Sequence, residues 1–259
     1  MEKLLSLPMG EFEIPVKVTE PDFGEITRCI VGVHGFCGHK DSPVLRSISE
    51  EMGIFGTACV SFDFPCHGDN PMTERDLSLL NCEMALLTVV QWAAETYPHT
   101  EKCLFATGFG AFITVQCLEG LQAEMGDLRL VLQTPDFQMA KSLLAMKSLT
   151  EESFRKKGRV TVGRIGDRKI EVPFSFYEQM RHATAYADFE MPMLLIHGEC
   201  DEVVPLEDVR HFRRINELSR LVIIPEADHQ FRGEGQWDMV VDLTRDWFET
   251  HRILLCDWE

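Results

Sequence analysis

Ionisable side chains follow several apolar runs of this sequence, at the points where the runs end. Asp201 comes shortly after MLLIHG (193–198), and His229 comes shortly after RLVII (220–224). A carboxylate that hydrogen-bonds a histidine lets the imidazole take up and return a proton, which is acid–base chemistry. Taken singly, Asp201 is better explained as a solvated loop acid and His229 as a histidine of the core.

The segment CLFATGFGAF (103–112) joins an apolar run to a second apolar pattern through Thr-Gly-Phe-Gly. This order is typical of a strand, a tight turn and a helix, and such a turn serves either as a phosphate-binding loop or as a nucleophile elbow. The residue at its apex is Gly108. Dinucleotide binding is disfavoured because Ile113 occupies the third glycine position and no acidic residue ends the next apolar run, LRLVLQT.

The apolar runs alternate with segments of helical spacing, which predicts an α/β fold with a mostly parallel central sheet and helices on both faces. In such sheets, sites form outside the carboxyl ends of the strands, where Gly108, Asp201 and His229 all lie. We expect one domain over residues 1–259. The pattern predicts an edge strand at 11–18, buried strands near 29–35, 57–64, 102–107, 128–134, 192–198 and 220–228, and helices at 42–53, 74–97, 109–125, 205–217 and 235–252.

Residues 136–190 break the alternation. They contain a helical piece (137–149), a charged stretch (EESFRKKGR), a hairpin pattern (VTVGRIGDRKIEV) and an aromatic helix start (PFSFYEQM). An insertion of this length between strands is often a lid over a site, and surface decoration is the alternative. Phe174, Phe176 and Tyr177 favour the lid, because they give the insertion an apolar surface.

Four segments resemble, in order, those of the α/β-hydrolase family. HGFCGHKDSPVLRSISEEM (34–52) is similar to the HGF-x-G-H-K stretch of bacterial cinnamoyl and feruloyl esterase-like members, and SFDFPCHGD (61–69) resembles the D-x-x-G-H-G segment, with Cys66 where glycine is usual. MLLIHGECDEVVP (193–205) and IPEADHQF (224–231) resemble the segments that bear the acid and the histidine. The order elbow, acid, histidine is also that of the family.

The resemblance implies a serine-hydrolase site for carboxylic esters, with Asp201 as the acid and His229 as the base. It implies an oxyanion hole from the backbone N–H groups of Phe36 and Phe109. Residues 106–110, ATGFG, align with G-x-S-x-G, so Gly108 stands at the position of the nucleophilic serine. By analogy with these esterases, Phe174, Phe176 and Tyr177 are expected to bind an apolar or aromatic acyl group.

Glycine at position 108 should preserve the elbow, since glycine adopts left-handed conformations without a Cβ clash. The loss is chemical, because no hydroxyl remains to attack. Three hypotheses follow: an altered form of a chain with serine there, a natural non-catalytic relative that binds a small apolar or aromatic ligand, and a slow hydrolase. The slow hydrolase would use water or another nucleophile, for which Thr107, Cys37, Cys66 and Cys200 are weak candidates.

Composition excludes several other functions. A net charge of −17 disfavours binding to nucleic acid, and no apolar stretch approaches the roughly 20 residues of a membrane span. Nine cysteines without a C-x-x-C pair, and no signal peptide, indicate reduced thiols and a cytoplasmic location. His34 and His39 lack a carboxylate at metal-ligand spacing, so we expect no metal and no cofactor. The expected partner is a small-molecule ester or ligand; the oligomeric state stays open, a homodimer included.

Overall fold

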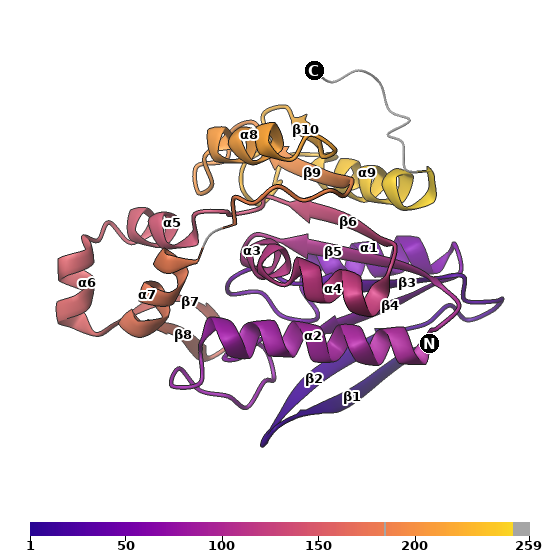
Figure 1. Ribbon diagram of the computed structural model, residues 1–259, viewed down its shortest axis with the longest axis horizontal. Helices are drawn as coiled ribbons and strands as arrows, with labels where there is room; N and C mark the ends of the chain where they lie inside the picture. Colours follow the sequence, from indigo (N-terminus) through magenta and orange to yellow (C-terminus); the bar gives the residue numbers. More distant parts are fainter. Residues whose placement is uncertain (184, 251–259) are drawn as a thin grey trace.

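The computed structural model describes residues 1–183 and 185–250, and its centre is a mostly parallel sheet with helices on both faces (Figure 1). The strand order is β1-β2-β4-β3-β5-β6-β9-β10, with only β1 and β2 antiparallel to their neighbours. The predicted fold class is confirmed. The strands of the sheet are β1 (Glu2–Met9), β2 (Phe12–Thr19), β3 (Arg28–Val33), β4 (Thr57–Phe62), β5 (Glu101–Thr107), β6 (Leu128–Gln133), β9 (Met193–Gly198) and β10 (Arg220–Ile224).

The two faces of the sheet are covered by different helices. One face packs on α1 (Pro43–Gly53) and α9 (Gln236–Thr250), and the other on α2 (Leu79–Thr96), α3 (Phe109–Gln116), α4 (Leu118–Met125) and α8 (Leu206–Ile215). Both faces of the central strands are apolar, because a parallel sheet between helix layers has no solvent-facing side. Among the described residues, no helix has the length and apolar character of a membrane span.

The elements inserted between β6 and β9 lie together at one end of the sheet, on the left in Figure 1. It consists of α5 (Met139–Met146), α6 (Glu151–Lys157), the antiparallel hairpin of β7 (Arg159–Ile165) and β8 (Arg168–Pro173), and α7 (Phe174–His182). The predicted hairpin is therefore present. Its Arg168 guanidinium donates to the backbone carbonyls of Asn70 (2.6 Å) and Met72, which fastens the hairpin to the loop after β4.

The N-terminal strands differ from the prediction. The strand predicted at 11–18 is β2, and it is not an edge strand, because β1 pairs with it along its whole length and occupies the edge instead. Pro15, which has no N–H to donate, lies just outside the stretch of β2 that pairs with β4, Val16–Thr19, and its carbonyl accepts the Asp63 N–H at 3.0 Å.

Two predicted helices also have different bounds. The helix predicted at 74–97 begins at Leu79, because the Asp76 carboxylate accepts the Thr73 N–H at 2.8 Å and shapes a turn before it. The helix predicted at 109–125 divides into α3 and α4, and the Thr114 hydroxyl donates to the Gly110 carbonyl, a bond that bends helices. Residues 251–252, predicted to end the last helix, lie outside the described residues.

Candidate active site

Gly108 forms the turn between β5 and α3 with φ 52° and ψ −113°, a conformation that L side chains rarely adopt. Its N–H donates to the Gln133 carbonyl at 3.0 Å, and its carbonyl accepts from Phe112 at 3.2 Å. A Cβ built on Gly108 would meet only the Gly35 Cα, at 3.9 Å. The turn is therefore held by main-chain bonds, and the space for a side chain at its apex is open.

Gly110 allows the elbow to lie directly against the end of β3. A Cβ at this position would come 2.5 Å from the His34 carbonyl oxygen and 2.8 Å from that of Val33. Any larger residue would push α3 away from the strand. The second glycine of the elbow pattern is thus required by packing, whereas the glycine at 108 is compatible with a side chain at the cost of strain.

Phe36, which follows β3, and Phe109, which follows Gly108, line the same pocket. In the part of the chain that the structure describes, neither of their backbone N–H groups donates to a protein acceptor. The two phenyl rings pack edge to face with centroids 5.0 Å apart. Phe109 is also the first residue of α3, where the helix dipole is positive. Both N–H groups are available to an electronegative ligand atom.

Asp201 and His229 are joined by a hydrogen bond of 2.8 Å between Oδ2 and Nδ1. The other oxygen, Oδ1, accepts the backbone N–H groups of Val203 and Val204, both at 2.8 Å. Burial alone would raise the pKa of Asp201, but the bonds from His229 and the backbone hold that pKa below its usual value. The carboxylate therefore stays ionised and holds the imidazole in one orientation.

A pocket of about 530 Å³ connects these groups. Phe36, Gly108, Phe109 and His229 all line it, so the structure brings four predicted site residues to one cavity, with Asp201 directly behind His229. The rest of its wall is largely apolar. It includes Val44, Met139, Met146, Val203 and Trp237.

Phe174, Phe176 and Tyr177 do not line this pocket. Phe174 and Tyr177 pack on Phe154 within the insertion, with ring centroids 5.3 and 5.4 Å away. Phe176 is fully buried and lies behind the Phe36 and Phe109 rings, at 6.5 and 6.0 Å. A direct role in substrate binding stays a prediction. Phe176 packs the insertion against the elbow, whereas Phe174 and Tyr177 pack inside the insertion.

Sequence reasoning missed several polar residues of the same pocket, among them Gln133 and Asp136. Asp136 is 4% exposed, and burial raises its pKa to about 6 even though the Ser142 hydroxyl and the Gln138 N–H donate to it. Both residues come at the carboxyl end of β6, a position of the same kind as those of Gly108 and Asp201. The rule that found the predicted residues would have found these two as well.

The histidines that follow β3 and β4 have structural roles. His34 Nδ1 donates to the Gly35 carbonyl at 2.8 Å and Nε2 accepts the Phe64 N–H at 3.1 Å, while burial lowers its pKa to about 4. His67 is equally buried, and its Nδ1 donates to Pro65 at 2.8 Å. The described residues contain no group of three or more His, Cys, Asp or Glu side chains that could hold a metal ion.

Two of the candidate cysteines, Cys37 and Cys66, lie in surroundings that disfavour a nucleophilic thiolate. Burial raises the pKa of Cys37, which lines the pocket, to about 11 and that of Cys66 to about 12. The reactive species of a cysteine is the thiolate, which both environments disfavour. Cys37 instead supports the insertion, since a Cβ on Gly163 of the hairpin would come 2.5 Å from its sulfur.

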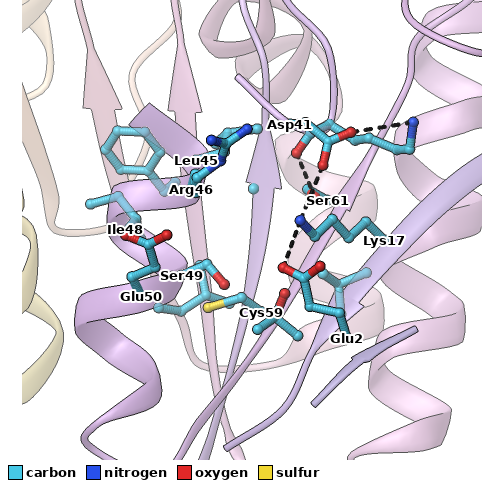
Figure 2. Close-up of a pocket in the computed structure, with 16 residues that line it drawn as sticks. Glu2, Lys17, Asp41, Leu45, Arg46, Ile48, Ser49, Glu50, Cys59 and Ser61 are labelled. Carbon is cyan, nitrogen blue, oxygen red and sulfur yellow. Dashed lines mark hydrogen bonds and ion pairs between the residues drawn. The ribbon is translucent and has the colours of Figure 1, made fainter. Parts of the chain in front are cut away.

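A second, smaller pocket lies between α1 and the strands β2, β3 and β4 (Figure 2). The Lys17 ammonium stands at its wall between the carboxylates of Glu2 (2.8 Å) and Asp41 (3.1 Å). Its volume is about 50 Å³, which admits water but not an acyl group. None of the predicted site residues lines it.

Comparison with solved structures finds close likeness of fold at low sequence identity. The chain matches Est1E of Butyrivibrio proteoclasticus with ferulic acid bound at 17% identity and a TM-score of 0.80, over 94% of this chain and 97% of that one. It matches a putative hydrolase of Agrobacterium vitis at 15% identity and a TM-score of 0.77, over 96% and 99%. Mouse alpha/beta hydrolase domain-containing protein 10 follows at 14% identity and 0.74, over 96% and 100%.

No protein-family model matches the chain, and no curated protein matches it in sequence. The evidence for its fold is therefore structural: the strand order, the helices on both faces and near-complete superposition on hydrolases. The protein has the α/β-hydrolase fold.

Proposed function

We propose that this protein is a carboxylic ester hydrolase by descent that lacks its nucleophile and hydrolyses esters very slowly or not at all. The observation that carries the proposal is the Asp201–His229 hydrogen bond of 2.8 Å beside an elbow whose apex has open space but no side chain. A histidine that a carboxylate orients acts as a general base only when a hydroxyl or another acidic group lies within its reach. Gly108 stands where the serine hydroxyl of such a site is expected.

The missing step is the first one of the serine-hydrolase reaction. A serine oxygen at position 108 would attack the ester carbonyl and pass its proton to His229 Nε2, while Asp201 stabilises the imidazolium that forms. The N–H groups of Phe36 and Phe109 would bind the oxyanion. The alcohol would leave with the proton from His229, and water would release the acid from the acyl-enzyme. With glycine at 108, no acyl-enzyme forms.

The proposed ligand is an ester with an apolar or aromatic acyl group. Its support is the largely apolar wall of the pocket, with Met139, Met146 and Trp237, and a volume of about 530 Å³ that suits a small aromatic molecule. The likeness to Est1E, a structure with ferulic acid bound, agrees with this class of ligand. A volume of this size leaves room for more than the acyl group.

A second candidate is a natural binding protein that keeps the pocket and has no use for turnover. The observation in its favour is that two unpaired N–H groups and an oriented imidazole converge on a cavity without a nucleophile. Such a set recognises an ester or acid carbonyl by hydrogen bonds alone. This protein would show ligand-dependent thermal stabilisation with no turnover, in the parent chain and in a serine variant alike.

The deciding experiment compares the parent chain with Gly108→Ser and Gly108→Ala on short p-nitrophenyl esters and hydroxycinnamate esters. The serine variant should gain up to about 10⁶-fold in kcat/KM, because removing the serine from a complete triad costs about 2 × 10⁶-fold in kcat. The alanine variant adds the same Cβ without a hydroxyl, so it should gain nothing. A folded serine variant with no gain over alanine rejects the esterase proposal and leaves the binding protein.

A further inference from the structure

His197 is a buried histidine that the proposed reaction does not use, and it lies beside the acid. It is the next-to-last residue of β9 and pairs with Ile223 of β10. Its side chain is completely buried and is not among those that line the pocket. Since buried polar side chains are kept for the bonds that they make, His197 has to act on the turn that follows its own strand.

The tautomer of His197 follows from its hydrogen bond to Val204. Nε2 lies 3.0 Å from the Val204 carbonyl oxygen, and because a carbonyl only accepts, Nε2 carries the proton. Nδ1 is buried and has no partner within residues 1–183 and 185–250. Burial lowers the pKa of His197 although the Asp201 carboxylate is near, so the ring stays uncharged at neutral pH. His197 is therefore a neutral N–H donor.

The backbone of Val204 is held by two side chains. Its N–H donates to Asp201 Oδ1 at 2.8 Å, and its carbonyl accepts from His197 Nε2. Val204 thereby connects the histidine to the acid. An apolar residue in place of His197 would fill the same space, but the Val204 carbonyl, in a residue that is itself buried, would lose this donor. The turn that orients Asp201 would then be held less firmly.

His197 also lies close to the oxygen that the catalytic pair shares. Its Nε2 is 3.6 Å from Asp201 Oδ2, and that oxygen accepts from His229 Nδ1 at 2.8 Å. The longer distance exceeds that of a hydrogen bond. A charged ring at this place would compete with His229 for the carboxylate, because ion pairs between completely buried groups are little screened. The neutral ring leaves Oδ2 to His229.

We propose that His197 is a positioning residue of this site. Its Nε2–H holds the turn of Asp201 through the Val204 carbonyl, and this keeps Oδ2 oriented towards His229. The inference deepens the proposed function, because it concerns the same acid and base. Its first test needs no turnover, since the bond between Asp201 and His229 can be observed in the parent chain.

Proton NMR can follow that bond through the strongly deshielded Nδ1–H resonance of His229. Glutamine at 197 places a side-chain N–H near the position of the histidine Nε2, whereas the shorter asparagine cannot reach the Val204 carbonyl. The resonance should persist in the parent chain and in His197→Gln, and should be lost by exchange with water in His197→Asn and His197→Met. His211→Asn, the same change at an exposed histidine of α8, should leave it intact.

Kinetics separate positioning from a general loss of structure. In the Gly108→Ser background, His197→Asn should lower kcat about 10- to 100-fold with KM nearly unchanged, because a misplaced base impairs the reaction and not binding. His197→Gln should keep most of the activity. An equal loss in His197→Gln and His197→Asn would show that the ring's packing, not its N–H, supports the turn, and would overturn the proposal.

Two further results would overturn it without any turnover. One is a His229 resonance that is missing from the parent chain or unchanged in folded His197→Asn and His197→Met. The other is a His197 ring that carries its proton on Nδ1, since Nε2 could not then donate to Val204. Nitrogen-15 shifts of the parent chain decide this second point even if both variants fail to fold. Failure of Gly108→Ser to gain activity would reject the proposed function and leave the NMR result standing.

Discussion

The elbow and the acid–histidine pair face each other across one pocket, but different parts of their machinery are intact. At the elbow, the backbone is complete: Gly108 has a positive φ of 52°, Gly110 allows the close approach to β3, and the Phe109 N–H has no acceptor among the described residues. At the pair, the functional side chains are complete, with Asp201 and His229 joined at 2.8 Å. The elbow has the backbone geometry of a nucleophile turn but no nucleophilic side chain. The Asp201–His229 pair has the side chains of a base but no serine hydroxyl to deprotonate.

The reason for this difference is which atoms hold each region together. Hydrogen bonds of the elbow use the main chain at 108, so a serine oxygen can be absent without loss of structure. Asp201 is different, since it also caps the N–H groups of Val203 and Val204 and thereby holds its own loop. Its presence is partly structural. His229 bonds to Asp201 alone among the described side chains, so its retention supports the proposed descent more strongly than that of Asp201.

The largest effect should appear when the pair is broken in an active background. In Gly108→Ser, a further Asp201→Asn change should lower kcat by about 10⁴-fold, because asparagine stabilises the wrong tautomer of His229. The measurement is steady-state hydrolysis of p-nitrophenyl esters. Glu202→Gln, which neutralises the exposed neighbouring acid, should change little. An equal loss in both variants would mean that general electrostatics, not the pair, supports the reaction.

The elbow can be tested through stability. Gly110→Ala should lower the free energy of unfolding by about 3 kcal/mol or more, because its Cβ would overlap the His34 carbonyl oxygen. Gly108→Ala should cost about 1–2 kcal/mol, because it meets strain but no clash. Urea unfolding of the two variants measures both values. A larger loss for Gly108→Ala than for Gly110→Ala would contradict the account, in which packing requires glycine at 110 and position 108 has room for a side chain.

Asp136, between the two regions, should affect stability in a pH-dependent way. Its folded-state pKa of about 6 exceeds the usual 3.8, so the folded chain holds a proton that the unfolded chain releases between these values. This carboxyl group therefore destabilises the fold above pH 6, and its cost disappears as the pH falls below about 4. Asp136→Asn should raise the free energy of unfolding by about 3 kcal/mol at pH 8.

The same substitution should bring almost no gain at pH 4, where the parent carboxyl group is already protonated in both states. Thermal unfolding at the two pH values is sufficient to see the difference. A gain that is equal at pH 4 and pH 8 would show that packing, not the charge of Asp136, limits stability at this position.

The sequence predicts the site as far as strand order determines it. Gly108, Asp201 and His229 follow the carboxyl ends of strands, which a parallel sheet brings to one edge. Asp136 lies two residues beyond the predicted strand LRLVLQT, so the same rule places it at this edge of the sheet. That the Gln133 amide oxygen has no partner among the described residues cannot be predicted from the sequence, because it depends on which groups the fold brings near the amide.

The insertion shows where sequence reasoning ends. Aromatic residues at helical spacing indicate an apolar face, but not whether that face lines a cavity or packs on its own neighbours. Phe174 and Tyr177 pack on Phe154, and Phe176 supports the Phe36 ring from behind. The first strand was missed because EKLLSLPM alternates weakly, with Leu4 exposed at the open edge of the sheet.

The most direct test of the central claim is labelling with a fluorophosphonate, followed by intact mass and peptide mapping. The claim is that every part of an esterase site except the hydroxyl is in place. It predicts no adduct on the parent chain, and on Gly108→Ser a single adduct at the new serine that His229→Ala abolishes. A folded Gly108→Ser protein that stays unlabelled, or a parent chain labelled at Thr107 or a cysteine, would contradict it.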